Sequence, residues 1–426
     1  MNRCFYTLVY YLLLPFIFLR LLWRARKAPD YAKRWPERLG FFPAPPQTGG
    51  LWLHSVSVGE TIAAAPLIKQ IQQAYPQLPI VITTMTPTGS DRVRAIFGDS
   101  VFHVYIPYDI PCAVNRFLAK TQPKLVLIME TELWPNLIHC CHQNNIPQIV
   151  MNARMSERSA RGYQRFAKLA KGMLGKLSLV AAQTAGDAER LLSLGLLQEQ
   201  LVVTGSLKFD IRVPEEIKSQ SQGIRSSWGN DRPVWIAAST HAGEDEQVLA
   251  AYQWLRQKLP DLLLVLVPRH PERFTQAAVL CQSSGLNVSR RSAREAVTAD
   301  THVMLSDTMG ELLLLYATAD VAFVGGTLVP TGGHNFLEPA ALGVPVICGP
   351  HRFNFAQVSE MLLVAGAMRE VSNASELGTA VLAVLTQPTL HQQMSSAGAA
   401  VIAANRGAQQ RMFEQIKGFL ESSPPR

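Results

Sequence analysis

Acidic side chains follow two apolar segments in the first half of the sequence. Glu60 comes after the apolar segment 51–56, and Glu130 and Glu132 come after the segment 124–129. If these segments are parallel strands, the carboxylates stand at the carboxyl edge of a sheet, where α/β folds bind their ligands. A carboxylate held there can accept a proton from a reacting hydroxyl group. Each acid also fits the first turn of a helix, which the helix dipole favours, so both interpretations stay open.

Basic residues give the second half of the chain the character of an anion site. Pro268 and Arg269 follow the apolar segment 262–267, where a guanidinium group can bind a phosphate or a carboxylate. The segment 307–311, Asp-Thr-Met-Gly-Glu, has the composition of a helix start. Lys208, near the middle of the chain, either faces a ligand or is a solvated surface charge.

The segment 325–345 contains two glycine pairs that let the backbone approach a ligand closely. The helix expected after them, over 334–342, directs free N–H groups toward that ligand. Glu338 lies in its first turn, where the carboxylate either accepts hydrogen bonds from ribose hydroxyls or only favours the helix dipole. Together with Gly343-Val344-Pro345, these features predict a nucleotide-sugar site.

Several common catalytic motifs are absent from the sequence. There is no Asp-x-Asp, Walker or Gly-x-Ser-x-Gly motif, which argues against metal-bound diphosphate chemistry, nucleotide hydrolysis and α/β-hydrolase chemistry. The six cysteines include no Cys-x-x-Cys pair, so we expect reduced thiols in a cytosolic compartment. The run His139-Cys140-Cys141-His142 has the residue types of a metal site, but we favour two buried thiols near a helix end. No metal is expected.

Apolar runs alternate with amphipathic stretches from Leu51 onward, which predicts a doubly wound parallel sheet. The polar segment 208–232 interrupts the alternation and is expected to be a linker. The predicted class is α/β, with two Rossmann-like domains, 25–207 and 233–410, facing a cleft, and with a C-terminal helix and tail at 411–426. The expected strands are 51–56, 80–85, 101–106, 124–129, 148–152, 179–183, 234–239, 262–267, 321–326 and 344–349. The expected helices are 60–74, 110–120, 156–176, 243–259, 308–319, 334–342 and 353–364.

Residues 1–24 are expected to form a membrane-anchor helix. The segment 4–23 is almost entirely apolar and reaches the roughly 20 residues needed to cross a bilayer. Basic residues follow the run and no small-residue cleavage site is present, which argues against a signal peptide. The position of these basic residues predicts that the chain following the helix lies on the cytoplasmic side of the membrane. A buried or interfacial helix is the alternative, because Pro15 and the marginal length weaken a full span.

The net charge is concentrated at the same end of the chain. There are 40 Lys and Arg against 32 Asp and Glu, a net charge of +8. Residues 1–40 hold eight basic and two acidic residues, so +6 of this charge lies there. The remainder is nearly neutral, which argues against a nucleic-acid-binding protein. An anionic membrane surface is the partner that fits.

Long stretches of the sequence resemble the bacterial 3-deoxy-D-manno-octulosonic acid (Kdo) transferases of lipopolysaccharide assembly. The stretches that carry the resemblance are RKAPDYAKRWPERLGF, HSVSVGET, TTMTPTGSDRV, YIPYD, LVLIMETELWPNL, GSLKFD, AASTHAGE, LVPRHPERF, DTMGELLLLYATADVAFVGGTL and GGHNFLEPAA. The resemblance implies an inverting glycosyltransferase of the two-domain GT-B type, which moves Kdo from CMP-Kdo, a substrate and not a cofactor. The implied acceptor is the lipid A precursor, as lipid IVA or Kdo-lipid IVA, on the cytoplasmic face of the bacterial inner membrane.

The resemblance also implies roles for individual residues. Glu60 matches the general base of the family, and Glu130 and Lys208 match residues that stabilise the transition state. The residues that match its CMP-binding segments are Pro268, Arg269, Met309, Gly310, Glu311, Asn335, Phe336, Leu337 and Glu338. Two other classes remain as alternatives: a nucleotide-sugar 2-epimerase with the same two-domain fold, and a non-catalytic protein that binds sugar nucleotides or lipids.

Overall fold

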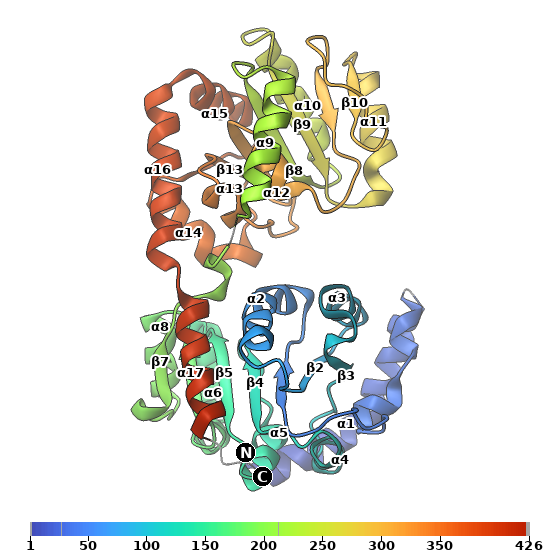
Figure 1. Ribbon diagram of the computed structural model, residues 1–426, viewed down its shortest axis with the longest axis vertical. Coiled ribbons are helices and arrows are strands. Elements are labelled where there is room, and N and C mark those ends of the chain that lie inside the picture. Colours follow the sequence, from blue (N-terminus) through green and yellow to red (C-terminus); the bar gives the residue numbers. More distant parts are fainter. Residues whose placement is uncertain (1, 27, 212, 423–426) are drawn as a thin grey trace. The chain divides into compact units, whose positions relative to one another are not determined.

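The computed structural model describes residues 2–26, 28–211 and 213–422 (Figure 1). The chain divides into two compact units: unit 1 is Met1–Asp210 with Arg406–Arg426, and unit 2 is Ile211–Asn405. Each unit contains a parallel sheet of seven strands with helices between the strands. The predicted α/β class with two Rossmann-like halves is therefore confirmed.

The sheet of unit 1 has the strand order β3-β2-β1-β4-β5-β6-β7. Its strands are β1 (Leu51–His54), β2 (Ile80–Thr84), β3 (Phe102–Tyr105), β4 (Leu125–Met129), β5 (Gln148–Ala153), β6 (Leu179–Ala182) and β7 (Leu201–Val203). The helices of the unit are α1 (Arg3–Ala25), α2 (Val58–Ala74), α3 (Pro87–Phe97), α4 (Pro111–Thr121), α5 (Pro135–Gln143), α6 (Glu157–Gln164), α7 (Ala167–Leu174), α8 (Ala185–Ser193) and α17 (Ala408–Ser422). Short 3-10 turns include Pro29–Ala32, Trp35–Leu39 and Leu207–Phe209.

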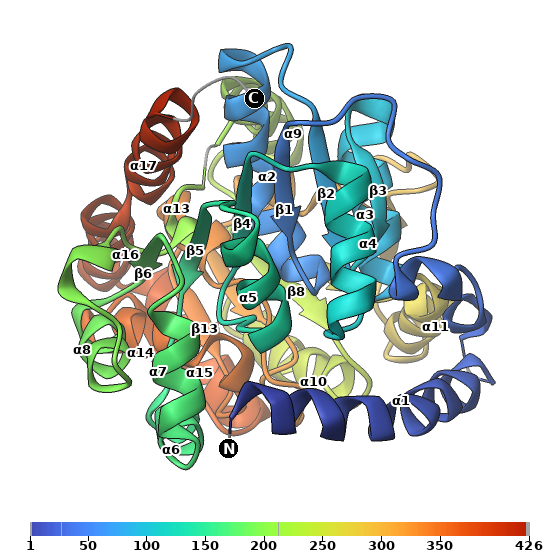
Figure 2. The ribbon, with the colours of Figure 1, turned by 90° about the horizontal axis from the view of Figure 1, so that it is seen from below.

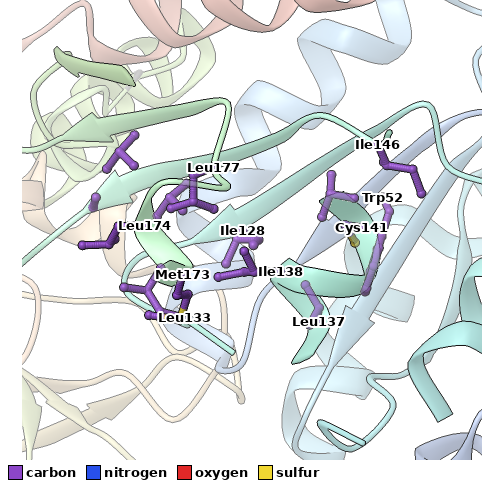
Figure 3. Packing of buried hydrophobic residues seen from close by; sticks show 14 of the residues in the cluster. Trp52, Ile128, Leu133, Leu137, Ile138, Cys141, Ile146, Met173, Leu174 and Leu177 are labelled. Atoms are coloured by element: carbon purple, nitrogen blue, oxygen red, sulfur yellow. The ribbon is translucent and has the colours of Figure 1, made fainter. Parts of the chain in front are cut away.

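Both faces of this sheet are buried. Trp52 of β1 packs on one face, where its ring centroid lies 4.4 Å from that of Phe117 in α4. Figure 3 shows this cluster, in which Trp52, Ile128 of β4 and Cys141 of α5 take part. Leu53, the next residue of β1, belongs to the cluster on the other face, together with residues of α2 and α17. Successive strand residues face opposite sides, so burial of both faces explains the nearly continuous apolar runs.

The sheet of unit 2 has the strand order β10-β11-β9-β8-β12-β13-β14. Its strands are β8 (Val234–Thr240), β9 (Leu263–Pro268), β10 (Val288–Arg290), β11 (Val303–Leu305), β12 (Val321–Val324), β13 (Val346–Cys348) and β14 (Met368–Glu370). Its helices are α9 (Glu215–Trp228), α10 (Asp245–Arg256), α11 (Phe274–Ser283), α12 (Leu312–Tyr316), α13 (Leu337–Ala341), α14 (Ala356–Val364), α15 (Ala374–Thr386) and α16 (Pro388–Asn405). Buried residues again cover both faces of the sheet.

The division into units differs from the expected boundaries at two places. The segment 208–232, expected to be a linker, contains the 14-residue helix α9, whose Trp228 packs in a core cluster of unit 2. The C-terminal helix α17 belongs to unit 1, because Met412 and Ile416 are buried in the same cluster as Leu51. Sequence pattern did not predict either result, since contacts distant along the chain decide both.

Several elements also differ in length from the prediction. The helix expected over 156–176 is divided into α6 and α7, because the backbone of Phe166 leaves the helical region (φ −122°, ψ 38°). The helices expected over 308–319 and 334–342 shorten to α12 and α13, five residues each. The three-residue strands β7, β10, β11 and β14 were not predicted, because they do not lie in longer apolar runs. The equally short β13 was predicted, since it lies in the apolar run 344–349.

Candidate active site

Glu60 lies in the first turn of α2, directly beyond the carboxyl end of β1. Its carboxylate accepts hydrogen bonds from the backbone N–H of Val56 (2.8 Å) and from the Ser57 hydroxyl (2.8 Å). Ser57 Oγ in turn accepts a hydrogen bond from the Glu60 N–H (3.3 Å), so Ser57 is the N-cap residue of α2. Both sequence interpretations therefore apply to this residue: it is a helix-start acid, and it stands at the ligand-binding edge of the sheet.

Burial raises the pKa of Glu60 to about 7, and the nearby charges of Glu130 and Glu132 act in the same direction. The hydrogen bonds from Val56 and Ser57 oppose this increase. The side chain is only 9% exposed, so loss of hydration is the main cause. A carboxylate with a pKa near neutrality is well suited to accept a proton at physiological pH.

Glu130 and Lys208 form an ion pair beside this acid. Lys208 Nζ lies 3.2 Å from Glu130 Oε1, and both side chains are about one-third exposed. Glu130 precedes α5 by five residues, so it is not a first-turn acid of that helix. Its φ of 54° lies in the left-handed region, which is strained for a residue with a side chain and is common at functional sites. Lys208 therefore has a defined partner and is not a free surface charge.

Asn152, at the end of β5, is a residue that sequence reasoning missed. Its Oδ1 accepts the N–H of Leu207 (3.0 Å), which ties the turn carrying Lys208 to the sheet. Asn152 is fully buried with φ 53°, and its Nδ2 has no hydrogen-bond partner. A polar residue ending an apolar strand, at the same sheet edge as Glu60 and Glu130, was the available signal.

In unit 2, Arg269 and Glu338 lie close enough to influence each other. Arg269 is exposed at the end of β9, and its N–H donates to Thr240 O of β8 (3.0 Å). Glu338 is the second residue of α13, and its Oε1 accepts a hydrogen bond from Asn335 Nδ2 (3.0 Å). Burial raises the pKa of Glu338, whereas Asn335 and the charge of Arg269 lower it. This arrangement fits both a ribose ligand and a helix-start acid.

The other predicted nucleotide-binding residues differ in how exposed their side chains are and in whether they already have a partner. The Phe336 and Leu337 side chains are buried, so they shape the loop and only their backbone can meet a ligand. Met309 is 61% exposed. The Glu311 carboxylate is paired with Arg291 (Nη2 to Oε1, 2.7 Å), which lowers its pKa. Gly310 has φ 89°, a conformation that favours glycine, and Pro268 ends β9 inside the buried sheet.

Glu244 was also missed, although it organises the glycine-rich loop. Its carboxylate is fully buried and accepts four backbone N–H groups, at 2.7–2.9 Å. The donors are His241, Gly326, Thr327 and Leu328. The acid therefore joins the loop after β8 to the loop after β12. The signal was the polar run Thr-His-Ala-Gly-Glu that follows a predicted strand.

The remaining sequence features lie away from these residues. Cys140 and Cys141 are buried in α5, and burial raises the pKa of Cys140 to about 11, as for buried thiols. Within the described ranges, no group of three or more His, Cys, Asp or Glu is arranged to hold a metal ion. Two surface hollows, about 820 and 650 Å³, share Gly49 and Lys124 in their walls, at the amino edge of the unit 1 sheet. They therefore lie at the edge opposite to Glu60.

Comparison with known proteins identifies the family. The family model described as 3-deoxy-D-manno-octulosonic-acid transferase matches residues 33–211. A 3-deoxy-D-manno-octulosonic acid transferase of Haemophilus influenzae is 46% identical, over 99% of this chain and 99% of its own. The chain belongs to the Kdo transferase family. A second Kdo transferase, of Bordetella pertussis, is 37% identical over 99% of this chain and 100% of its own.

A solved structure shows the same fold with a different activity. The UDP-GlcNAc 2-epimerase of Neisseria meningitidis superposes with a TM-score of 0.58, covering 87% of this chain and all of its own. It is only 16% identical, so the likeness concerns the fold alone. Membership of the Kdo transferase family makes this chain a glycosyltransferase. Family membership therefore excludes both alternative hypotheses, the epimerase and the non-catalytic binding protein.

Proposed function

We propose that this Kdo transferase moves Kdo from CMP-Kdo to the lipid A precursor, as lipid IVA or Kdo-lipid IVA, with inversion at the anomeric carbon and without a metal. The observation that carries the proposal is Glu60, a buried carboxylate with a pKa of about 7 at the sheet edge, beside the Glu130–Lys208 ion pair. This is the chemistry needed to activate a sugar hydroxyl at neutral pH.

In the proposed reaction the acceptor hydroxyl attacks the anomeric carbon of Kdo. The bond from that carbon to the CMP phosphate oxygen breaks, and Glu60 takes the hydroxyl proton. CMP leaves with the bonding electron pair, so no separate acid is required. Charge develops as in other glycosyl transfers, with positive character on the sugar and negative character on the leaving phosphate. Lys208 and Glu130 stabilise this charge distribution in the transition state.

The donor site is proposed on unit 2. Arg269 is exposed and suits the phosphate of CMP, because a guanidinium group forms directed, charge-assisted hydrogen bonds to phosphate oxygens. Glu338 and Asn335, which already share a hydrogen bond, offer acceptors and donors to the ribose. Pro268, the segment 309–311 and the backbone of 336–337 complete the proposed contacts with CMP.

The N-terminal helix α1 is the basis for the proposed membrane attachment. Among the described residues it is the helix that is long and apolar enough to cross a membrane. Its N-terminal end and its second half, however, are both docked on the rest of unit 1. Arg3 Nη1 donates to Asn136 Oδ1 (3.0 Å), and the ring of Phe18 meets that of Tyr108 edge-on, with centroids 5.7 Å apart. A helix crossing the bilayer would carry these attached polar segments into hydrocarbon.

We therefore propose that α1 lies in the plane of the membrane. Large apolar side chains recur every three or four residues on its undocked face and are exposed. They are Phe5, Leu8, Leu12, Phe16, Leu19 and Trp23. Exposed Arg20, Arg24 and Arg26 follow at the C-terminal end, where they can bind anionic headgroups. The charge distribution favours the cytoplasmic face of the inner membrane.

The docked position also suits a lipid acceptor. Asn136 lies at the start of α5, beyond β4, and the side chains of Thr7 and Arg3 both donate to its Oδ1. Tyr11 contacts Cys112 at the start of α4, beyond β3. α1, seen lengthwise in Figure 2, therefore lies along the same sheet edge as Glu60. A membrane bound to α1 would present its lipids at that edge.

A direct assay tests the proposed function. The full chain, in detergent or vesicles, is incubated with CMP-Kdo and lipid IVA, and the lipid is analysed by mass spectrometry. We expect a mass increase of one or more Kdo residues that depends on CMP-Kdo and persists in the presence of EDTA. A lipid of unchanged mass would refute the proposed acceptor. Activity lost with EDTA and restored by a divalent metal would refute the metal-free mechanism.

A further inference from the structure

Two histidines of unit 2 come together from loops that are 93 residues apart in the sequence. His241 follows β8 and His334 lies in the glycine-rich loop after β12; their Nε2 atoms are 2.7 Å apart and their ring planes are 3° apart. The His270 ring, after β9, meets His241 edge-on with centroids 5.4 Å apart. All three therefore lie at the carboxyl edge of the sheet, next to Arg269.

The pair is held in place by the buried Glu244 carboxylate. Glu244 accepts the backbone N–H of His241 and of Gly326, which belong to the two loops that carry the pair. Gly326 has φ 70°, and a Cβ at this position would come within 3.2 Å of the His334 ring. The glycine therefore leaves room for the imidazole, and the carboxylate fixes the two loops relative to each other.

An Nε2-to-Nε2 contact at this distance requires one shared proton. One imidazole donates its N–H and the other accepts with its lone pair, because two protonated Nε2 atoms would repel each other. In the neutral pair the accepting imidazole also carries its own proton on Nδ1, and the Nδ1 of the donating imidazole is free to bind one further proton. The pair can thus be neutral or carry one positive charge, and the surroundings decide which state is populated.

The surroundings are basic. Burial lowers the pKa of His334 to about 4, and Arg269, His241 and His270 act in the same direction. The pKa of His241 is also lowered, by burial and by His270, Arg273 and Arg269, although Glu244 opposes this. Glu244 itself is occupied by backbone N–H groups, and Arg273 is paired with Asp245. An anion placed here would gain from the basic groups and would favour protonation of the pair.

We propose that His241 and His334 form an anion subsite of the donor site, which binds an acidic group of the sugar nucleotide and takes up one proton as it does so. The acidic group is either the phosphate or the carboxylate of the sugar. The inference rests on the proposed donor site of unit 2. It adds to that site two binding residues and a proton linkage, which makes donor affinity increase toward acidic pH.

Calorimetric titration of the full chain tests the subsite. CMP is titrated at pH 6.5 and pH 8 in two buffers of different ionisation enthalpy, so that proton uptake is measured directly. One proton taken up per ligand changes the affinity by at most about tenfold per pH unit. Because the phosphate of CMP itself titrates near pH 6, proton uptake by the wild type is compared with that of His241→Asn, His334→Asn and the double variant.

The expected result is greater proton uptake by the wild type than by each variant, with a flatter pH dependence in the variants. His142→Asn, which removes an exposed imidazole of unit 1, serves as the matched control and should behave as wild type. Melting temperatures confirm that the variants are folded. If a variant takes up fewer protons than the wild type and its melting temperature is unchanged, unfolding is not the cause.

The source of the acidic group is identified by comparing CMP, cytidine, free Kdo and CMP-Kdo. If the wild type takes up more protons than the variants on binding CMP, but not on binding cytidine, the subsite binds the phosphate. A difference with free Kdo or CMP-Kdo, but none with CMP, assigns it to the carboxylate. Equal proton uptake by wild type and double variant with every ligand overturns the inference while leaving the donor site in place. A wild-type chain that binds neither CMP nor CMP-Kdo refutes the donor site and the subsite together.

Discussion

Replacement of Glu60 by Gln separates the two roles of this residue. In the structure the carboxylate accepts hydrogen bonds from the Val56 N–H and the Ser57 hydroxyl. A Gln amide keeps this arrangement, because its oxygen accepts from Val56 and its NH₂ donates to Ser57 Oγ. The helix start is preserved and only the base is lost. General-base catalysis contributes about 10²–10⁴-fold, so we expect a decrease of that size in turnover.

The same substitution should lower turnover without lowering the stability of the folded chain. The pKa of Glu60 is raised from 4.5 to about 7, so the folded state binds this proton more tightly than the unfolded chain does. The stability that this group contributes therefore falls as pH rises from about 4.5 to 7. Gln carries no charge and avoids that loss, which has an upper limit of about 3 kcal/mol at pH 8. We expect the variant at pH 8 to melt at the same temperature as wild type or higher.

Ser57→Ala is the matched control. It removes the cap, at a cost of about 1 kcal/mol of stability, but it keeps the base. The hydrogen bond from Ser57 lowers the pKa of Glu60, so its loss should move the midpoint of the pH–rate profile upward from about 7. Transfer is measured in single turnovers from pH 5.5 to 9, with thermal melting in parallel. Near-wild-type turnover in Glu60→Gln would refute the base, and a pH-independent wild-type rate would refute the pKa argument.

Three further changes test the other proposals. Glu338→Gln should lower the affinity for CMP at least about tenfold with little change in melting temperature; unchanged affinity with a lower melting temperature would show a purely structural acid. Lys208→Met should reduce single-turnover transfer by about tenfold or more, the value of one charge-assisted hydrogen bond, and an unaltered rate would exclude its role in the transition state. Leu12→Glu with Phe16→Glu should release the chain from anionic vesicles in flotation assays, whereas Val279→Glu, on an exposed site of unit 2, should not. Retention of the double variant would mean that another surface binds the membrane.

The fold class was predictable because both sheets are buried on both faces. Such strands are nearly continuous apolar runs, and β1, β4, β8 and β9 could be located from composition alone. The same rule placed Glu60, Glu130 and Arg269 at strand ends. Local pattern also indicated the apolar character of α1. These features depend on neighbours in the sequence, which is why the sequence determined them.

The tertiary structure decided which side chains meet. Lys208 is 78 residues from Glu130, and Glu244 is more than 80 residues from the loop that it holds; local pattern contains no information on such distances. The raised pKa of Glu60 and the docking of α1 along its length likewise follow from burial by distant segments. Composition could indicate that α1 is long enough to span a bilayer, whereas its contacts with unit 1 at Arg3 and Phe18 are the basis of the proposal that it lies flat. The sequence thus determined the elements and their edges, whereas pairings, burial and protonation depend on which remote segments the fold brings within a few ångströms.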